Sequence, residues 1–129
     1  MSTASATRDL VVVAETYNDV RQLVGDILRD EGYQVVTVSR GAEVLPAVKK
    51  HKPQLILLDL SFPDVPGNEI LRQLNASPDT NQIPVIVVSA YTEQLRRVPQ
   101  VRGVVNKPFD LSTLIDAVES TRRPRVQRA

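Results

Sequence analysis

The chain contains no cysteine among its 129 residues. This absence excludes a disulfide scaffold, a thiolate metal site and catalysis by a cysteine nucleophile. No apolar run approaches the roughly 20 residues that a membrane-spanning helix requires, and the amino-terminal stretch MSTASATRD lacks the apolar segment of a secretory signal. We therefore expect a cytoplasmic protein with no membrane partner, in which residues 1–8 form a disordered leader.

The charge of the chain is unevenly distributed. The formal net charge is +1, but the last eight residues, RRPRVQRA, hold four arginines and no acid, so acids outnumber bases in the rest. A basic tail can contact nucleic acid or an acidic partner. Without aromatic neighbours it is more typical of a solvated end. We take residues 122–129 as a basic tail or linker stub, and we do not expect nucleic acid as a partner.

Apolar runs alternate with helical patterns along the chain. Short β-branched runs predict strands at residues 10–14, 35–38, 55–58, 85–88 and 103–105. Apolar residues at helical spacing predict helices within residues 20–31, 41–51, 68–74 and 111–118. Gly32 stands where a left-handed cap ends the first helix, and Pro46 predicts a kink or late start in the second. Asp110 or Ser112 can cap the last helix.

Strands that alternate with helices predict an α/β fold with a parallel sheet. Parallel neighbours need right-handed crossover connections, which place helices on both faces of the sheet. In such open sheets the functional crevice lies beyond the carboxyl ends of the strands. Side chains that directly follow the strands are therefore the candidates for a site.

Polar side chains follow four of the predicted strands. In chain order they are Glu15 and Thr16, Asp59 and Ser61, Ser89, and Lys107. Carboxylate and carbonyl oxygens suit magnesium, which also keeps several waters and takes phosphate oxygens. A lysine supplies a point charge to a phosphate, and a serine hydroxyl adds a hydrogen bond. The sequence thus predicts a site for an anion bound to a carboxylate with a divalent cation beside it.

Four segments in order carry a resemblance to a known family. They are EGYQVVTV, LILLDLSFPDVPG, VIVVSAY and VVNKPFDL. Together they resemble the receiver domain of two-component response regulators, over residues 9–121. The resemblance implies a flavodoxin-like, three-layer α/β/α sandwich whose five-stranded parallel sheet has the strand order 2-1-3-4-5.

The resemblance also implies a function. A histidine kinase or phosphotransfer protein would pass a phosphoryl group to Asp59, and the domain would signal to a downstream protein by conformational change. It would therefore act as a switch and not as an enzyme with a diffusible substrate. Lys107 would contact the phosphate, Ser89 would hydrogen-bond it, and Glu15, Asp59 and the carbonyl of Ser61 would hold Mg²⁺. The Lys107–Pro108 peptide would be cis, and homodimers are common in the family.

One departure from the family concerns the metal. Receivers usually carry two adjacent acids after the first strand, where this chain has Glu15 and Thr16. With one carboxylate fewer, Mg²⁺ should bind weakly, and the Thr16 hydroxyl suits an N-terminal cap of the next helix better than a metal site. The alternative is a degenerate receiver that binds partners without phosphorylation.

Other departures concern signalling and the choice of reaction. Val104 stands where the family usually has a switch aromatic, and Tyr91 is a candidate for a reduced switching role. The segment between Ser89 and Val104 is short and contains Pro99, which predicts a short or irregular helix. A phosphatase of the same fold is a further alternative. It is disfavoured because the next acid after Asp59 is Asp64, beyond a proline.

Overall fold

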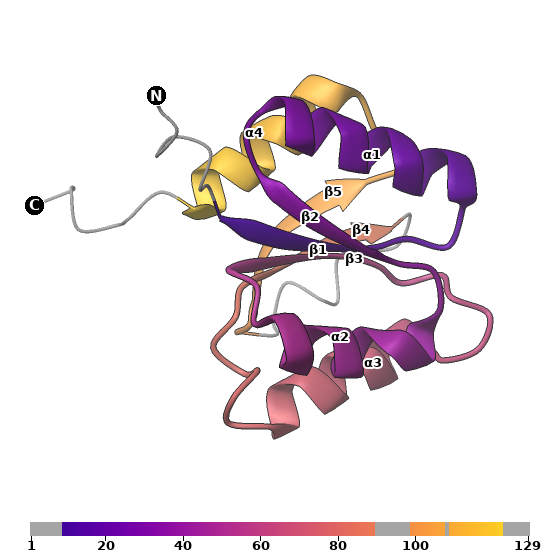
Figure 1. Cartoon of the computed structure of the whole chain (residues 1–129). Coiled ribbons are helices and arrows are strands. Elements are labelled where there is room, and N and C mark those ends of the chain that lie inside the picture. Colours follow the sequence, from indigo (N-terminus) through magenta and orange to yellow (C-terminus); the bar gives the residue numbers. More distant parts are fainter. Residues whose placement is uncertain (1–8, 90–98, 108, 123–129) are drawn as a thin grey trace, which may run out of the picture.

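The fold is a single parallel sheet between two layers of helices (Figure 1). The computed structural model of the chain describes residues 9–89, 99–107 and 109–122. Its strands are β1 (Leu10–Ala14), β2 (Gln34–Val38), β3 (Leu55–Asp59), β4 (Val85–Ser89) and β5 (Val101–Asn106). They pair in the order β2-β1-β3-β4-β5, and every pair is parallel. The predicted flavodoxin-like fold and strand order are confirmed.

The helices lie on both faces of this sheet. They are α1 (Asn18–Asp30), α2 (Val44–His51), α3 (Gly67–Ala76) and α4 (Leu111–Arg122), with a 3₁₀ turn, η1 (Gly41–Glu43), before α2. Helices α1 and α4 cover one face, and α2 and α3 cover the other (Figure 1). Helices α1, α2 and α3 thus form the crossover connections β1-α1-β2, β2-α2-β3 and β3-α3-β4, as parallel neighbours require.

The apolar runs form strands because both of their faces are covered. Successive side chains of a strand point to opposite faces. On β1, Val12 packs in the cluster beneath α2 and α3, whereas Val11 and Val13 pack in the cluster beneath α1 and α4. All five residues of β3 are buried, which explains why its sequence shows no alternation.

Most predicted boundaries agree with the structure within two residues. Gly32 has a φ of 97°, as the predicted left-handed cap requires. Helix α2 begins late, after η1, so Pro46 sits in its first turn. Asp110 caps α4, because its carboxylate accepts the backbone N–H of Thr113 at 3.1 Å.

Strand β5 begins two residues before its predicted start. The exposed Arg102 interrupts the apolar pattern there, so no run of apolar residues marked this part of the strand. The ladder nevertheless extends, since the N–H of Val85 donates to the carbonyl of Gln100 at 2.9 Å. A register shift opposite Val85 and Ile86 accommodates the extra length.

Several predictions fall outside the described residues: the disordered leader, the basic tail beyond residue 122, the irregular helix with Tyr91, and the cis peptide before Pro108. They stay predictions. Among the helices that the structure describes, none combines the length and the apolar character needed to cross a bilayer.

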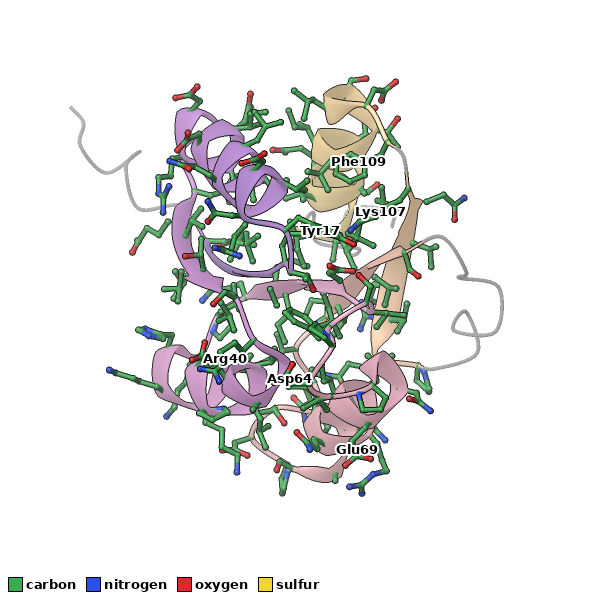
Figure 2. The ribbon with its side chains drawn as sticks, turned by 90° about the vertical axis from the view of Figure 1, so that its right-hand side faces the viewer. Tyr17, Arg40, Asp64, Glu69, Lys107 and Phe109 are labelled. Atoms are coloured by element: carbon green, nitrogen blue, oxygen red, sulfur yellow. The ribbon has the colours of Figure 1, made fainter. Side chains whose placement is uncertain are left out.

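The loop after β3 is fastened to the start of the second helical segment. The Asp64 carboxylate accepts the backbone N–H groups of Gly41 and Ala42 at 2.9 and 3.0 Å. These hydrogen bonds lower the pKa of Asp64 below its ordinary value. Figure 2 shows Asp64 beside Arg40 at this junction. Because Asp64 is engaged here, it gives no support to the phosphatase alternative.

Candidate functional site

The site lies at the carboxyl edge of the sheet, where β1 and β3 end side by side. Ala14 pairs with Leu58, so Glu15 and Asp59 are the next residues on the two strands. Both are nearly inaccessible, with Glu15 4% exposed and Asp59 1% exposed. Two carboxyl groups are thus held together at the edge of the core, as the sequence predicted.

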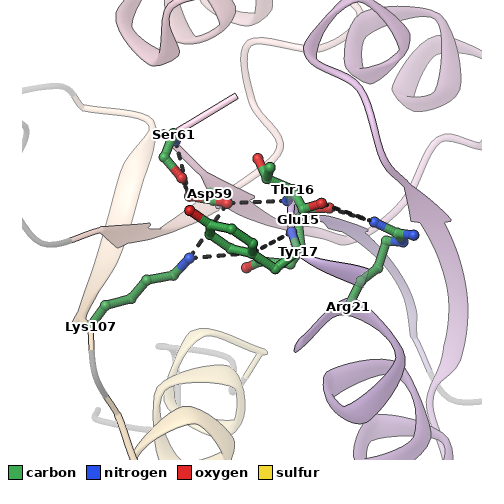
Figure 3. Close-up of polar contacts among 7 residues, drawn as sticks. All are labelled: Glu15, Thr16, Tyr17, Arg21, Asp59, Ser61 and Lys107. Carbon is green, nitrogen blue, oxygen red and sulfur yellow. Dashed lines mark hydrogen bonds and ion pairs between the residues drawn. The ribbon is translucent and has the colours of Figure 1, made fainter. Parts of the chain in front are cut away.

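Asp59 is surrounded by hydrogen-bond donors. Its Oδ1 accepts the backbone N–H and the hydroxyl of Ser61 at 3.0 and 2.7 Å, and its Oδ2 accepts the N–H of Thr16 at 3.1 Å (Figure 3). Burial raises the pKa of Asp59, but these hydrogen bonds and one from Glu15 outweigh it, so the pKa is lowered from 3.8. Asp59 is therefore ionised at neutral pH, the state that a carboxylate nucleophile needs.

The pKa of Glu15 is shifted in the opposite direction, upward. Burial raises its pKa above the ordinary 4.5, and the neighbouring Asp59 adds to the rise. The N–H of Tyr17, which donates to Glu15 Oε2 at 3.1 Å, and the charge of Lys107 act against it without cancelling it. The environment thus separates the pKa values of the two carboxyl groups, with Asp59 the stronger acid.

Lys107 completes the site from the end of β5, the strand at one edge of the sheet. It follows β5, and its backbone N–H donates to the carbonyl of Ser89 at 3.1 Å. Its ammonium lies 3.3 Å from Glu15 Oε2 and 3.5 Å from Asp59 Oδ2 (Figure 3). One cation therefore faces two carboxylates, so the ionised pocket keeps a net negative charge for a further cation.

Ser89 ends β4 at the same edge. The register pairs Asp59 with Val88 and Ser89 with Asn106, so Ser89 stands one residue beyond Asp59 on the neighbouring strand. This placement agrees with the predicted contact to a phosphate on Asp59. The role of Ser89 stays a prediction.

The prediction that Thr16 caps α1 is wrong. Residue Tyr17, in an extended conformation, is the N-cap, and no side chain caps the helix. The Thr16 Oγ1 is buried and has no hydrogen-bond partner in the part of the chain that the structure describes. Thr16 lies one residue before the cap position, and its N–H donates to Asp59 Oδ2 at 3.1 Å.

Arg21 holds this loop from the helix side, a contact that the sequence did not predict. Its Nη1 donates to the carbonyl of Glu15 at 2.9 Å and reaches that of Thr16 at 3.4 Å, and its Nη2 donates to Asn18 Oδ1 at 2.6 Å. An arginine in the first turn of an amphipathic helix is usually a surface residue, so no sequence pattern distinguished Arg21 from other exposed arginines.

The oxygen atoms at the site are of the kind that binds a divalent cation, but they are few. Within the described residues no three His, Cys, Asp or Glu side chains gather as a metal site. The oxygens at hand are the carboxylates of Glu15 and Asp59 and the unpartnered hydroxyl of Thr16. Hard oxygen ligands of this kind suit Mg²⁺, which keeps several waters. A carboxylate count below the family's usual three predicts weak binding.

Comparison with known proteins decides the family. Residues 11–119 match the model of the response regulator receiver domain. The chain belongs to this family. Receiver domains are signalling modules of two-component systems. The polar-differentiation response regulators DivK of Brucella anthropi and Brucella ovis are 28% and 27% identical to this receiver, over 85% and 88% of its chain and 93% and 95% of theirs.

Solved structures share the fold of this receiver domain. The chemotaxis response regulator CheY4 of Vibrio cholerae superposes with a TM-score of 0.81 at 24% identity, covering 89% of this chain and 99% of its own. The receiver domain of a sensor histidine kinase from Pseudomonas aeruginosa has a TM-score of 0.77 at 21% identity, covering 87% and 95%. That structure carries a magnesium ion in its active-site cleft.

Proposed function

We propose that this receiver domain accepts a phosphoryl group on Asp59 from the phosphohistidine of a histidine kinase or phosphotransfer protein. The observation that carries the proposal is the ammonium of Lys107, 3.5 Å from Asp59 Oδ2, at a carboxylate whose pKa is lowered. A lysine in this place balances charge on a phosphoryl group that joins the carboxylate. A downstream protein would then distinguish the two states of the domain.

The transfer is a displacement at phosphorus. A carboxylate oxygen of Asp59 forms the new O–P bond while the N–P bond of the phosphohistidine breaks, and the departing imidazole takes up a proton from water. Oδ1 accepts two hydrogen bonds from Ser61, and Oδ2 accepts one from Thr16. We take Oδ2 as the attacking atom because it faces Lys107. Lys107 then follows the charge from the carboxylate to the phosphoryl oxygens, and Ser89 donates its hydroxyl to one of them.

Magnesium, held by Glu15, Asp59 and the carbonyl of Ser61, would supply further positive charge to the phosphoryl oxygens. Beryllofluoride, which mimics the phosphoryl group, tests the proposal when it is titrated with Mg²⁺ into labelled protein. The amide signals of Asp59, Ser89 and Lys107 should shift together. No response at millimolar Mg²⁺ would favour the degenerate receiver.

One observation favours that second candidate. Thr16 occupies the place of the family's second acid, and its hydroxyl is buried without a hydrogen-bond partner among the described residues. If the pocket is too poor in charge to hold a cation, the domain would bind its partners in one state only. A mutation that changes the charge of the pocket therefore tests whether charge limits cation binding.

Thr16→Asp should tighten Mg²⁺ binding by about tenfold, because it adds a carboxylate next to Glu15 and Asp59. Mg²⁺ titration followed by NMR gives the dissociation constant. Gln22→Asp, which adds the same charge at an exposed position of α1, serves as the matched control and should leave the constant unchanged. Equal effects of the two variants would mean that residue 16 does not face the cation.

A further inference from the structure

Tyr17 occupies a position that helix capping does not explain. It is the N-cap of α1, where Ser, Thr, Asp and Asn are favoured because their side chains bond the first free N–H groups. A tyrosine ring cannot do this, and no side chain caps the helix. Tyr17 is also 59% exposed, whereas Glu15 and Asp59 beside it are buried.

Both the backbone and the ring of Tyr17 engage the candidate site. Its N–H donates to Glu15 Oε2 at 3.1 Å, and its ring centroid lies 5.3 Å from the ammonium of Lys107. Figure 3 shows the ring between Lys107 and the end of β1. A cation over an aromatic face at this distance is attracted to it. The ring therefore helps to hold Lys107 where it faces the carboxylates of Asp59 and Glu15.

The same ring forms one wall of an open groove of about 770 Å³ between α1 and α4. Figure 2 shows Tyr17, Lys107 and Phe109 together at this place. Leu23 of α1 and Leu111 of α4 also line the groove, and with Tyr17 they are the exposed large apolar residues of the described part of the chain. Tyr17 thus contacts Lys107 of the candidate site and also lines the groove.

We propose that Tyr17 is the positioning residue that holds Lys107 over Asp59 before phosphorylation and is released after it, which changes the wall of the α1–α4 groove. The inference rests on the proposed function. A hydrogen bond between an ammonium and a phosphoryl oxygen is stronger than an exposed cation–π contact. Once Asp59 carries a phosphoryl group, Lys107 turns to its oxygens and the ring loses its partner.

This role supplies what the β5 strand lacks. Val104 has no ring that could alternate between two orientations. Tyr17, with its ring at the surface and its backbone tied to Glu15, can change orientation without disturbing the core. The reporter of phosphorylation in this domain is therefore on the β1–α1 side of the site.

Lysine side-chain NMR tests the resting contact without any phosphoryl donor. The CεH₂ signal of Lys107 should carry a ring-current shift that Tyr17→Ala removes and Tyr17→Phe retains. Leu23→Ala, which alters the same groove away from Lys107, should leave the signal in place. An unchanged Lys107 signal in Tyr17→Ala would overturn the positioning role.

Fluorine NMR of protein labelled with 3-fluorotyrosine tests the release. The chain has three tyrosines, and Tyr17→Phe assigns the signal of residue 17. On addition of beryllofluoride and Mg²⁺ that signal should move, whereas that of Tyr33, buried with its hydroxyl bonded to Glu119, should not. A Tyr17 signal that stays unmoved while the Asp59 amide shifts would overturn the release and leave the proposed function intact.

The rate of phosphoryl uptake gives a second readout of the positioning role. Tyr17→Ala should gain the phosphoryl group from acetyl phosphate more slowly, by roughly threefold to tenfold, because Lys107 is no longer held over Asp59 before the transfer. Mass spectrometry at a series of times after addition of acetyl phosphate gives this rate, with Leu23→Ala as the control. No uptake by the unmodified protein would refute the proposed function, and the release step would fall with it, while the lysine NMR still decides the resting contact.

Discussion

Lys107→Met should lower the free energy of unfolding by about 2 kcal/mol at about pH 8, because two buried carboxylates lose the one ammonium that lies beside them among the described residues. Fully buried pairs cost more to break, but the Lys107 side chain is 23% exposed, and water screens part of its interaction. The same substitution should abolish the response to beryllofluoride, since the phosphoryl mimic loses its cation from the protein.

The loss of stability in Lys107→Met should depend on pH. Glu15 has a raised pKa, so the folded state binds this proton more tightly than the unfolded state. The resulting stabilisation is complete below the ordinary value of 4.5 and is lost as the pH rises through the raised value. Lys107 lowers this pKa, so its removal makes the loss with rising pH larger.

Urea unfolding at a series of pH values measures this dependence. The variant and the unmodified protein should differ least at about pH 4, where Glu15 is largely protonated, and most above neutrality. Lys50→Met, which removes an exposed lysine at the end of α2, is the control and should show little change at any pH. A variant that is as stable as the unmodified protein at alkaline pH would show that Lys107 does not balance the pocket.

Gly67→Ala should destabilise the protein by about 3 kcal/mol. A Cβ at residue 67 would lie 2.6 Å from the side chain of Leu60 and 2.8 Å from its Cα. Leu60 directly follows Asp59, and Gly67 begins α3, so relief of this clash must move the loop that carries Ser61. The substitution should therefore also weaken the beryllofluoride response.

Gly25→Ala provides the matched control for this change. Gly25 lies inside α1, and a Cβ there would meet the mobile end of Arg29 at 3.3 Å and nothing closer. Alanine is favoured over glycine in a helix interior by about 0.5–1 kcal/mol, so this variant should be unchanged or slightly more stable. Urea unfolding compares the two variants. Equal losses would mean that the tight approach at Leu60 does not limit this loop.

The sequence predicted the sheet well because both of its faces are covered. Continuous apolar runs that alternate with helical patterns favour a parallel sheet with helices on both sides. That arrangement brings the ends of β1, β3 and β5 to one edge, and the structure indeed places Glu15, Asp59 and Lys107 within hydrogen-bonding or ion-pair distance of one another.

What the sequence did not predict depends on contacts between segments distant in the chain. No local sequence pattern predicts the hydrogen bond from the N–H of Gly41 to Asp64 or the close approach of Leu60 to Gly67. Thr16 is a residue type that often caps helices, but α1 begins one residue later, and the N–H of Thr16 donates to Asp59, 43 residues further along the chain. Tyr17 was missed for the same reason, since its partner Lys107 lies at the other end of the chain.

The most direct test is the mass of the intact protein after incubation with acetyl phosphate and Mg²⁺. We predict the gain of one phosphoryl group by the unmodified protein, and none by Asp59→Asn, which keeps the size of the side chain but removes its nucleophilic carboxylate. A phosphoryl group on the Asp59→Asn variant would contradict the assignment of Asp59 as the acceptor.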